Sequence, residues 1–435
     1  MAVLLVCPDV VGPEMAGPGI RYHELGRALA ASHDVTLAAP IGSSSLPGGP
    51  PLVTYDRSRR STLLGLIRRA DVVVSPPLPP HLVAPASREG RLWIVDFYDP
   101  EPFEGLEYQL ARPRFERKAR DVLRIDRIVF AARAGGAFIC ASERQRDMWL
   151  GFLAACRRLD SDAYAHDREL RSLVEIVPFG LPDEPPEPAT EPFLRGAVFP
   201  PDARVIVWNG GLWDWFDPLT VLRAVSLLRR DDPAWRIAFL GTGRPGREVG
   251  MSMAAAAREL ADELDLVGSG AAYFHAGWTP YASRGAALLE CNIGVTAHLP
   301  TLEARFAHRS RMLDLLWAGL PIVCSTGDEW ADRVAKDRLG EVAPPGDPEA
   351  LAGALRRVVS NGRGVYAEQI RKTASDHRWS RVAEPLAGLI AAPPARKRVG
   401  TGAWMAAARH TGAELIMRAG ARARSGGGGP PRAAG

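Results

Sequence analysis

Short apolar runs alternate with helix-periodic stretches through the first 180 residues of the chain. The periodicity predicts helices at residues 20–32 and 143–155, and Ser142 followed by Gln145 is typical of a helix start. Because the strands are wholly apolar and alternate with helices, the pattern indicates a parallel sheet covered on both faces. Strands are predicted at residues 2–7, 35–39, 72–75, 92–96, 137–141 and 175–178.

A second alternating series follows a change of composition. The segment 183–202 is rich in proline and acidic residues and is typical of a linker. We therefore predict two doubly wound, Rossmann-like α/β domains, residues 1–182 and 203–375, that face each other across a cleft. Ligands of such sheets bind beyond the carboxyl ends of the strands, so the site is expected in that cleft. The second series predicts strands at 205–208, 236–240, 272–275, 293–296 and 322–324, and helices at 220–229, 253–264, 312–317 and 348–359.

Residues 395–435 form a basic tail in which Glu414 is the one acidic residue. Apolar residues such as Trp404 and Ile416 are interleaved with the arginines. A basic amphipathic segment of this kind fits peripheral contact with an anionic membrane. The other interpretation is a frayed helix followed by a disordered, glycine-rich end. The basic residues are Arg396, Lys397, Arg398, Arg409, Arg418, Arg422, Arg424 and Arg432.

Composition narrows the class of protein. The chain has 435 residues, 46% hydrophobic and 24% charged, which is ordinary globular composition. The net charge of +4, with no long basic face before the tail, argues against a nucleic-acid partner. The five cysteines include no CxxC pair, so we expect neither a zinc site nor a redox motif. No bound cofactor is expected either. The sequence shows neither a signal peptide nor a membrane span, so a soluble cytoplasmic protein is expected, with the inner membrane face as its only membrane contact.

A glycine-rich loop follows the first predicted strand. Gly17 and Gly19 allow close approach of the backbone, and the helix start behind them attracts anions. Arg21 lies in the first turn, where a positive charge opposes the helix dipole. A bound phosphate or an acidic acceptor would explain its presence. The alternative is an ordinary glycine turn with a solvated arginine.

Two aspartates come at or just past the end of the strand 92–96. Carboxylates at the carboxyl end of a strand face the cleft, so Asp96 and Asp99 are candidates to position a sugar hydroxyl or to assist proton movement. The structural alternative is a turn in which Asp99 and Pro100 stop the strand and Asp96 caps the following segment.

Two arginines introduce the apolar segment MLDLLWAGLPIVC. Arg309 and Arg311 stand beside a predicted helix start, and backbone N–H groups plus two guanidiniums make a diphosphate clamp. Asp314, one turn further, is a candidate acceptor for the hydroxyls of a ribose. The alternative is a solvated basic turn on a core helix.

With these stretches the sequence resembles the family 4 glycosyltransferases of the GT-B type. The resemblance covers about residues 1–391 and implies two Rossmann-like domains with a helix at 376–394 crossing back to the first. It implies a nucleotide-diphosphate sugar donor held mainly by the second domain, an acceptor held mainly by the first, retention at the anomeric carbon and no required metal. The matching stretches are PGIRYHELGRALAASHDVTLAAP, ASERQRDMWLG, EIVPFGLPDEPP, VWNGGLWDWFDPLTVLRAV, MLDLLWAGLPIVCS and DHRWSRVAEPL.

The chain departs from the family pattern at charged positions. The Arg and Lys with which the family binds the donor diphosphate fall on Gly211 and Phe216. Of two family glutamates eight positions apart, the second falls on Asp314 and the first on Phe306, with Glu303 nearby. Our hypothesis is that Arg309 and Arg311 replace the missing cations from the other side of the cleft.

Further candidates lie in two glycine-containing loops of the second domain. Trp213 or Trp215, in the loop NGGLWDWFD, is a candidate to stack on a base or a sugar, the alternative being aromatic residues that pack in the core. Gly210 and Gly211 are candidate backbone contacts of the donor. Gly241 and Gly243 are further candidate backbone contacts, in a region that the family uses near the nucleotide.

The leading hypothesis is a retaining glycosyltransferase that moves a hexose-type sugar from a nucleotide diphosphate to a hydroxyl acceptor. A lipid-linked or polysaccharide glycan is the expected acceptor, and a small-molecule natural product is the next choice. Two alternatives stay open because fold does not determine function: a nucleotide-sugar epimerase or hydrolase, and a non-catalytic partner protein that kept the fold. The missing Arg, Lys and Glu favour the last.

Overall fold

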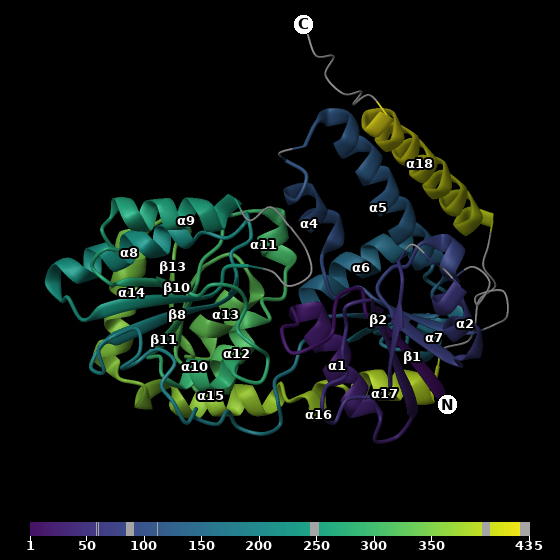
Figure 1. Cartoon of the computed structure of the whole chain (residues 1–435). Coiled ribbons are helices and arrows are strands. Elements are labelled where there is room, and N and C mark those ends of the chain that lie inside the picture. Colours follow the sequence, from purple (N-terminus) through teal and green to yellow (C-terminus); the bar gives the residue numbers. More distant parts are fainter. Residues whose placement is uncertain are drawn as a thin grey trace, which may run out of the picture.

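Two lobes of α/β structure lie side by side in the computed structural model of the chain (Figure 1). The structure describes residues 1–57, 59, 61–83, 91–110, 112–243, 252–393 and 401–426. Each lobe is built on one sheet in which neighbouring strands are parallel. The prediction of two tandem doubly wound domains is confirmed.

The first sheet has the strand order β3-β2-β1-β4-β5-β6-β7, which reverses between β1 and β4. Its central strands are buried on both faces, because apolar side chains alternate between two helix layers. The strands are β1 (Ala2–Val6), β2 (Asp34–Pro40), β3 (Leu52–Tyr55), β4 (Val72–Ser75), β5 (Leu92–Asp96), β6 (Ala137–Cys140) and β7 (Val174–Ile176). The helices are α1 (Gly17–Leu29), α2 (Ser61–Arg69), α4 (Glu101–Glu107), α5 (Arg114–Ala134), α6 (Glu143–Ala155) and α7 (Ser161–His166).

The second sheet has the order β10-β9-β8-β11-β12-β13, which reverses between β8 and β11. Its strands are β8 (Arg204–Gly211), β9 (Trp235–Gly241), β10 (Ala272–Phe274), β11 (Ile293–Thr296), β12 (Ile322–Ser325) and β13 (Gly340–Ala343). Its helices are α8 (Pro218–Asp231), α9 (Ser252–Glu263), α10 (Arg284–Leu289), α11 (Leu302–Phe306), α12 (Arg311–Trp317), α13 (Glu329–Lys336), α14 (Pro348–Asn361) and α15 (Gly364–Asp376).

The two connections between the domains run along one side of the molecule. In the segment predicted as the linker, the Glu290 carboxylate accepts hydrogen bonds from three successive N–H groups, at 193–195. The returning chain forms two short helices, α16 (Trp379–Val382) and α17 (Glu384–Ala391), in place of the single helix predicted at 376–394. The second helix begins anew because Pro385 suits only a first turn. Trp379 packs on Phe179 of the first domain.

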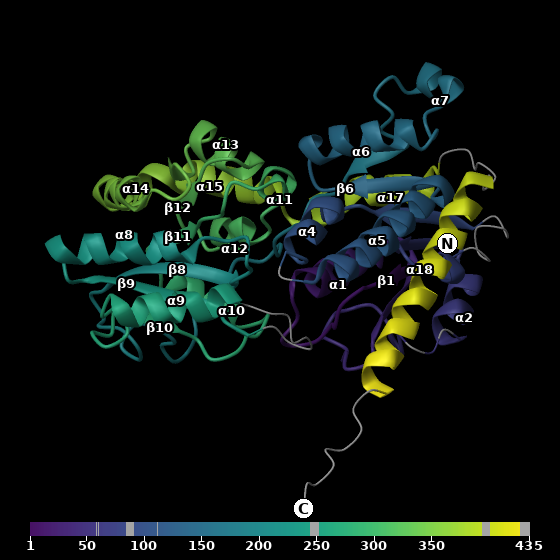
Figure 2. The same cartoon turned by 90° about the horizontal axis from the view of Figure 1, so that it is seen from above.

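Within the basic tail the structure has one long helix, α18 (Thr401–Gly426), and the predicted glycine-rich end at 427–435 lies outside the described residues. The helix packs along α5, as both views show (Figures 1 and 2). Ala403 and Ala406 are buried in this contact, and Arg409 pairs with Asp126 of α5. Small residues at one face of α18 permit the close packing of the two helices. Arg396, Lys397, Arg398 and Arg432 of the predicted tail lie outside the described residues.

Two searches of the described residues bear on membranes and metals. None of the helices in this part of the chain is both long and apolar enough to cross a bilayer. Among the same residues, no three His, Cys, Asp or Glu side chains gather as they would around a metal ion.

Candidate active site

The carboxyl ends of β8 and β11 meet where the strand order of the second sheet reverses, the place where open α/β sheets bind ligands. The pairing of β8 shifts by a bulge after Trp208, and Gly210 has a φ of +89°, a conformation that favours glycine. A Cβ on Gly241 would lie 2.7 Å from the carbonyl carbon of Gly210. Both glycines are therefore required for the backbone packing at this edge.

Arg311, the first residue of α12, lies against this bulge. Its guanidinium donates to the carbonyl oxygen of Gly211 at 2.9 Å and stacks 4.1 Å from the ring centre of Phe216. Its Nη1 atom is buried and has no hydrogen-bond partner among the described residues. Burial and the charge of Arg309 lower the pKa of Arg311 to about 9. Because arginine stays protonated in proteins, the lowered pKa indicates a positive charge that lacks a counter-ion.

Gly211 and Phe216 are the positions on which the sequence resemblance placed the family's Arg and Lys. In this chain the guanidinium of Arg311 contacts both of them, from the opposite wall of the site. Arg311 is therefore the arginine whose position agrees with the hypothesis that a cation from this wall replaces the missing Arg and Lys.

Arg309 is already paired with protein carboxylates. Its two terminal nitrogens donate to Glu303 at 3.2 and 3.0 Å, and its Nε donates to Asp328 at 3.4 Å. All three side chains are buried. A ligand phosphate would have to displace a carboxylate to reach this guanidinium. The role of Arg309 in a diphosphate clamp stays a prediction. In the structure its guanidinium connects α11 to the start of α13.

Buried polar atoms without a partner gather at the same edge. They are Asn209 Oδ1, Thr296 Oγ1, His298 Nε2 and Arg311 Nη1, and each lacks a hydrogen bond within the described part of the chain. The Nδ1 atom of His298 contacts Ser325 Oγ at 3.0 Å. Burial and the charges of Arg309 and Arg311 lower the pKa of His298 to about 3, so its ring is neutral. Unsatisfied buried polar groups are costly, and their concentration indicates a site prepared for a polar ligand.

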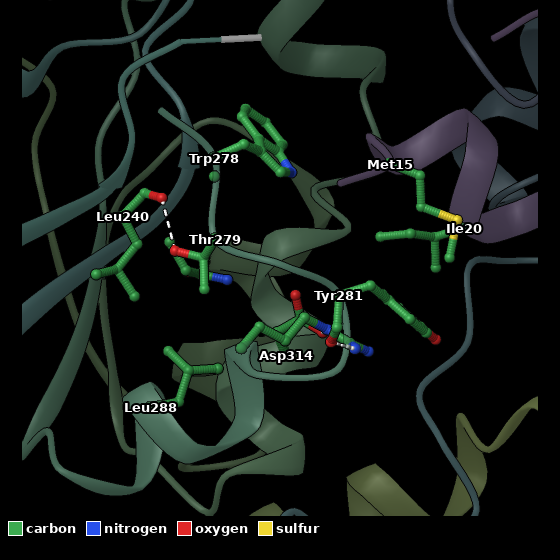
Figure 3. Close-up of a pocket in the computed structure, with 11 residues that line it drawn as sticks. Met15, Ile20, Leu240, Trp278, Thr279, Tyr281, Leu288 and Asp314 are labelled. Atoms are coloured by element: carbon green, nitrogen blue, oxygen red, sulfur yellow. Dashed lines mark hydrogen bonds and ion pairs between the residues drawn. The ribbon is translucent and has the colours of Figure 1, made fainter. Parts of the chain in front are cut away.

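A pocket that is partly open to solvent lies beside these atoms (Figure 3). Met15 and Ile20 reach it from the first domain, and its other walls come from the second. A site built from two domains on the carboxyl side of a parallel sheet is the expected location of a ligand in this architecture. The pocket is lined by Met15, Ile20, Asn209, Gly210, Leu240, Trp278, Thr279, Tyr281, Arg284, Leu288 and Asp314.

Asp314 lies on the wall of this pocket, and its carboxylate accepts a hydrogen bond from Arg284 Nε at 3.1 Å. The Arg284 guanidinium lies 3.7 Å from the ring centre of Tyr281. Tyr281 joins the domains, because its hydroxyl donates to Glu24 of α1 at 2.6 Å and its N–H donates to the Pro13 carbonyl at 2.7 Å. The carboxylate at Asp314 is therefore linked through two side chains to the first domain.

The start of α1 faces the second domain. A Cβ on Gly17 would lie 3.9 Å from Ser310 Oγ, and no side chain caps the helix. The N–H of Gly17 is thus uncapped near the domain boundary, while Pro18 carries no N–H. Gly19 has a packing role, because a Cβ there would lie 2.5 Å from the Val10 carbonyl oxygen.

Arg21 and Asp96 pair with each other inside the first domain. The Asp96 carboxylate accepts from Arg21 at 2.8 and 3.1 Å, and the guanidinium also donates to the carbonyls of Val177 and Pro178. Burial opposes the charge of Arg21, but Asp96 raises its pKa above the ordinary value. The guanidinium that we expected to meet a phosphate is therefore occupied by protein groups. The pair fixes the start of α1 against the end of β5.

Asp99 follows β5 of the first domain and is exposed to solvent. Nearby protein still desolvates its carboxyl group, and this desolvation, followed by the charges of Asp96 and Glu101, raises the pKa of Asp99 to about 7. A carboxyl group that titrates near neutral pH suits proton transfer. Its assignment as a catalytic residue stays a prediction.

The raised pKa of Asp99 predicts a pH-dependent effect on stability. A raised carboxyl pKa stabilises the fold below the unfolded-state pKa, and this contribution is lost as pH rises through the folded pKa. We expect the melting temperature of Asp99→Asn to be higher than that of wild type at pH 8 and equal to it near pH 4. Melting temperatures across this range, with the exposed Asp34→Asn as control, provide the measurement. Equal melting of Asp99→Asn and wild type at pH 8 would contradict a strained Asp99 carboxylate.

Comparison with known proteins supports the architecture. No family model matches the sequence, and no curated protein matches it. Sucrose-phosphate synthase from Thermosynechococcus elongatus is 15% identical with a TM-score of 0.60, covering 90% of this chain and 98% of that one. HepE of Anabaena, in complex with UDP and glucose, is 13% identical with a TM-score of 0.64. The match covers 90% of this chain and 99% of HepE. WaaG, a glycosyltransferase involved in lipopolysaccharide biosynthesis, is 14% identical with a TM-score of 0.60, covering 89% and 100%.

The chain has the GT-B fold. At these identities the likeness carries the fold and not the activity. Within the GT-B arrangement, the described pocket and Arg311 lie on the second-domain wall between the lobes, and Asp99 lies on the first-domain side.

Aromatic residues hold the GT-B domains together near the site. Trp213 is half-buried and packs on Gly211, since a Cβ there would lie 3.0 Å from its ring. Phe306, on which the sequence resemblance placed a family glutamate, stacks on Phe103 of α4 at 5.1 Å. This stack is an apolar contact between the two domains. Gly243 lies outside the pocket lining and donates its N–H to Gly277.

Sequence reasoning missed several residues that the fold brings to the site. Tyr281, Arg284 and Trp278 line the pocket, and His298 belongs to the unsatisfied cluster. A weak signal existed for His298, because it follows a buried strand at the carboxyl edge of the predicted sheet. The others lie in a loop and a short helix whose place depends on how the two domains meet.

Proposed function

We propose that this chain is a glycosyltransferase that moves a hexose-type sugar from a nucleotide diphosphate to a hydroxyl acceptor. The observation that carries the proposal is the uncompensated charge of Arg311 among unsatisfied polar atoms at the reversal point of the second sheet. A diphosphate would supply the missing counter-charge and hydrogen-bond acceptors. The neighbours with bound UDP and UDP-glucose make such a donor the first candidate.

Each part of the site has a proposed task. Arg311 binds the diphosphate and stabilises the charge that develops on it as the glycosidic bond breaks. Asp314 accepts hydrogen bonds from the ribose hydroxyls, which requires Arg284 to share or release its carboxylate. Asn209 and Gly210 contact the donor at the bulge of β8. We propose retention at the anomeric carbon and a reaction that needs no metal, following the family resemblance.

The acceptor belongs on the first-domain side of the cleft in this proposal. The uncapped start of α1 at Gly17 can bind an acidic group of the acceptor, and Asp99 can accept a proton from the attacking hydroxyl. A lipid-linked or polysaccharide glycan is the proposed acceptor class, and with it a cytoplasmic protein that contacts the membrane peripherally.

Nucleotide binding is the first test of this function. We expect one of UDP, GDP, dTDP or ADP to raise the melting temperature of the purified chain by mass action, and its sugar conjugates to do likewise. Calorimetric titration of that nucleotide should then give a single site. Absence of a shift with all four and with their sugar conjugates would remove the proposed function. Sugar release or epimerisation without an acceptor would instead assign a hydrolase or an epimerase.

A second candidate is a nucleotide-sugar-binding partner protein that performs no transfer. The specific observation in its favour is the stack of Phe306 on Phe103 where the sequence resemblance placed a family glutamate, while the nearby Glu303 is held by Arg309. This candidate predicts tight nucleotide-sugar binding, but no transfer to any glycan or lipid acceptor and no hydrolysis in long incubations. Turnover of the bound donor would exclude it.

A further inference from the structure

The basic charge of the chain is concentrated on two helices of the first domain. Residues 112–124 contain six basic residues (Lys or Arg) and two acidic residues. Residues 401–426 contain four basic residues and one acidic residue. The whole chain has 54 basic and 50 acidic residues. Outside these two segments it has 44 basic and 47 acidic residues, so the rest of the chain is slightly acidic. The excess positive charge of the protein therefore resides in the α5 start and α18.

These two helices lie antiparallel and project from the first domain (Figures 1 and 2). Trp404 contacts Phe130 and Arg409 pairs with Asp126, so successive residues of α18 meet earlier residues of α5. Continuing this register places residues 415 and 416 beside about residue 120, within the basic segment 112–124. The two charged segments thus form one surface, which we call the α5–α18 surface.

Large apolar side chains stand exposed on the same two helices. Phe115 is 67% exposed, Leu415 62% and Ile416 57%. Such side chains have no packing partner that would explain their presence on a monomer surface. Arg114 and Lys118, which flank Phe115, are exposed and form no ion pair with any described side chain.

We propose that the α5–α18 surface binds an anionic lipid bilayer. Exposed apolar residues enter the boundary between headgroups and acyl chains, while the surrounding Lys and Arg contact anionic headgroups. Unpaired cations together with large exposed apolar side chains favour a bilayer over an acidic protein or a nucleic acid. Only the bilayer offers an apolar region into which these side chains can insert. The surface is separate from the nucleotide pocket, so this proposal stands or falls independently of the proposed donor.

Vesicle sedimentation tests the proposal with the full chain. We expect binding to phosphatidylcholine vesicles with about a third phosphatidylglycerol, little binding to pure phosphatidylcholine, and loss of binding at about 0.5 M salt. Arg114→Glu/Lys118→Glu and Phe115→Ser/Leu415→Ser/Ile416→Ser should each lower partition at least about tenfold. Equal binding of both variants and wild type would overturn the assignment.

Matched controls on the second domain separate the surface from general effects. Arg223→Glu/Lys372→Glu reverses one exposed Arg and one exposed Lys, and Val267→Ser/Val365→Ser removes two exposed apolar side chains. Both controls should bind vesicles as wild type does, and all variants should keep the melting temperature and nucleotide response of wild type. Retention on immobilised polyglutamate without vesicle binding would overturn the proposal in favour of an acidic protein partner.

Discussion

Arg311→Ala is expected to weaken binding of the nucleotide diphosphate about 10- to 100-fold, because a hydrogen bond to a charged group contributes roughly 1.5–3 kcal/mol. The ligand-free variant should be as stable as wild type or more stable. Its side chain is a positive charge without a counter-ion, and its Nη1 has no partner within the described chain. Calorimetric titration and thermal unfolding of the same samples give both quantities.

This combination of results distinguishes a binding residue from a structural one. Arg311→Lys keeps the charge but loses the planar guanidinium, so it should recover part of the affinity. Arg223→Ala, an exposed arginine on α8, should leave binding unchanged. Unaltered nucleotide affinity in Arg311→Ala would exclude the arginine from the donor site. A large loss of stability in the ligand-free variant would show that its role is to hold the fold.

Asp96→Ala is expected to reduce the free energy of unfolding of the first domain by about 3–5 kcal/mol, the range for removing one partner of a buried ion pair. Its removal leaves the Arg21 guanidinium buried, with only the carbonyls of Val177 and Pro178 as partners. Urea unfolding monitored by fluorescence and circular dichroism provides the measurement.

The same experiment separates a structural from a catalytic Asp96. Asp34→Ala, at an exposed position of β2, should change stability by less than about 0.5 kcal/mol. Replacing both partners, in Arg21→Met/Asp96→Leu, should restore much of the stability lost in Asp96→Ala, because no charge is then left buried. A wild-type unfolding curve for Asp96→Ala would show that the pair contributes little, and would return Asp96 to the candidates for acceptor chemistry.

The two arginine pairs illustrate how the site is divided between support and binding. Arg21 and Arg309 each meet carboxylates in buried, multiple hydrogen bonds and thereby fix a helix start and a loop. Arg311 meets a carbonyl and an aromatic ring, neither of which neutralises it. In this arrangement the paired arginine stabilises the fold, and the neighbouring unpaired arginine is left for a ligand that folding does not require.

The local sequence pattern was enough to predict the central strands of both sheets and their order along the chain. Buried parallel strands are apolar throughout, so β1, β4, β5, β8 and β11 are evident from composition alone. The edge strands β3 and β13 were missed because half-buried residues interrupt the apolar run. The 21-residue α5 was missed because it is highly charged, and its buried face becomes visible only when α18 and the sheet cover it.

Candidate site residues were foreseen where chemistry follows a strand end. Gly210, Arg311 and Asp314 lie at the pocket or at its edge. Gln145 shows the limit of local reasoning: Ser142 caps its helix as expected, but the Gln145 amide also donates to carbonyls of Tyr98 and Phe306 and so joins the two domains.

Residue types and their periodicity therefore determined two Rossmann-like domains, and they predicted the sheet edge that holds the proposed site and a set of arginines and carboxylates near it. Only the folded chain decided which charges neutralise each other. Arg21 and Asp96 lie 75 positions apart, and Arg309 and Asp328 lie 19 apart, on separate elements. Charge pairing depends on distances that arise when the elements pack, and no local pattern encodes these distances. For that reason the same residue type is a support at 21 and 309 and an unpaired cation at 311.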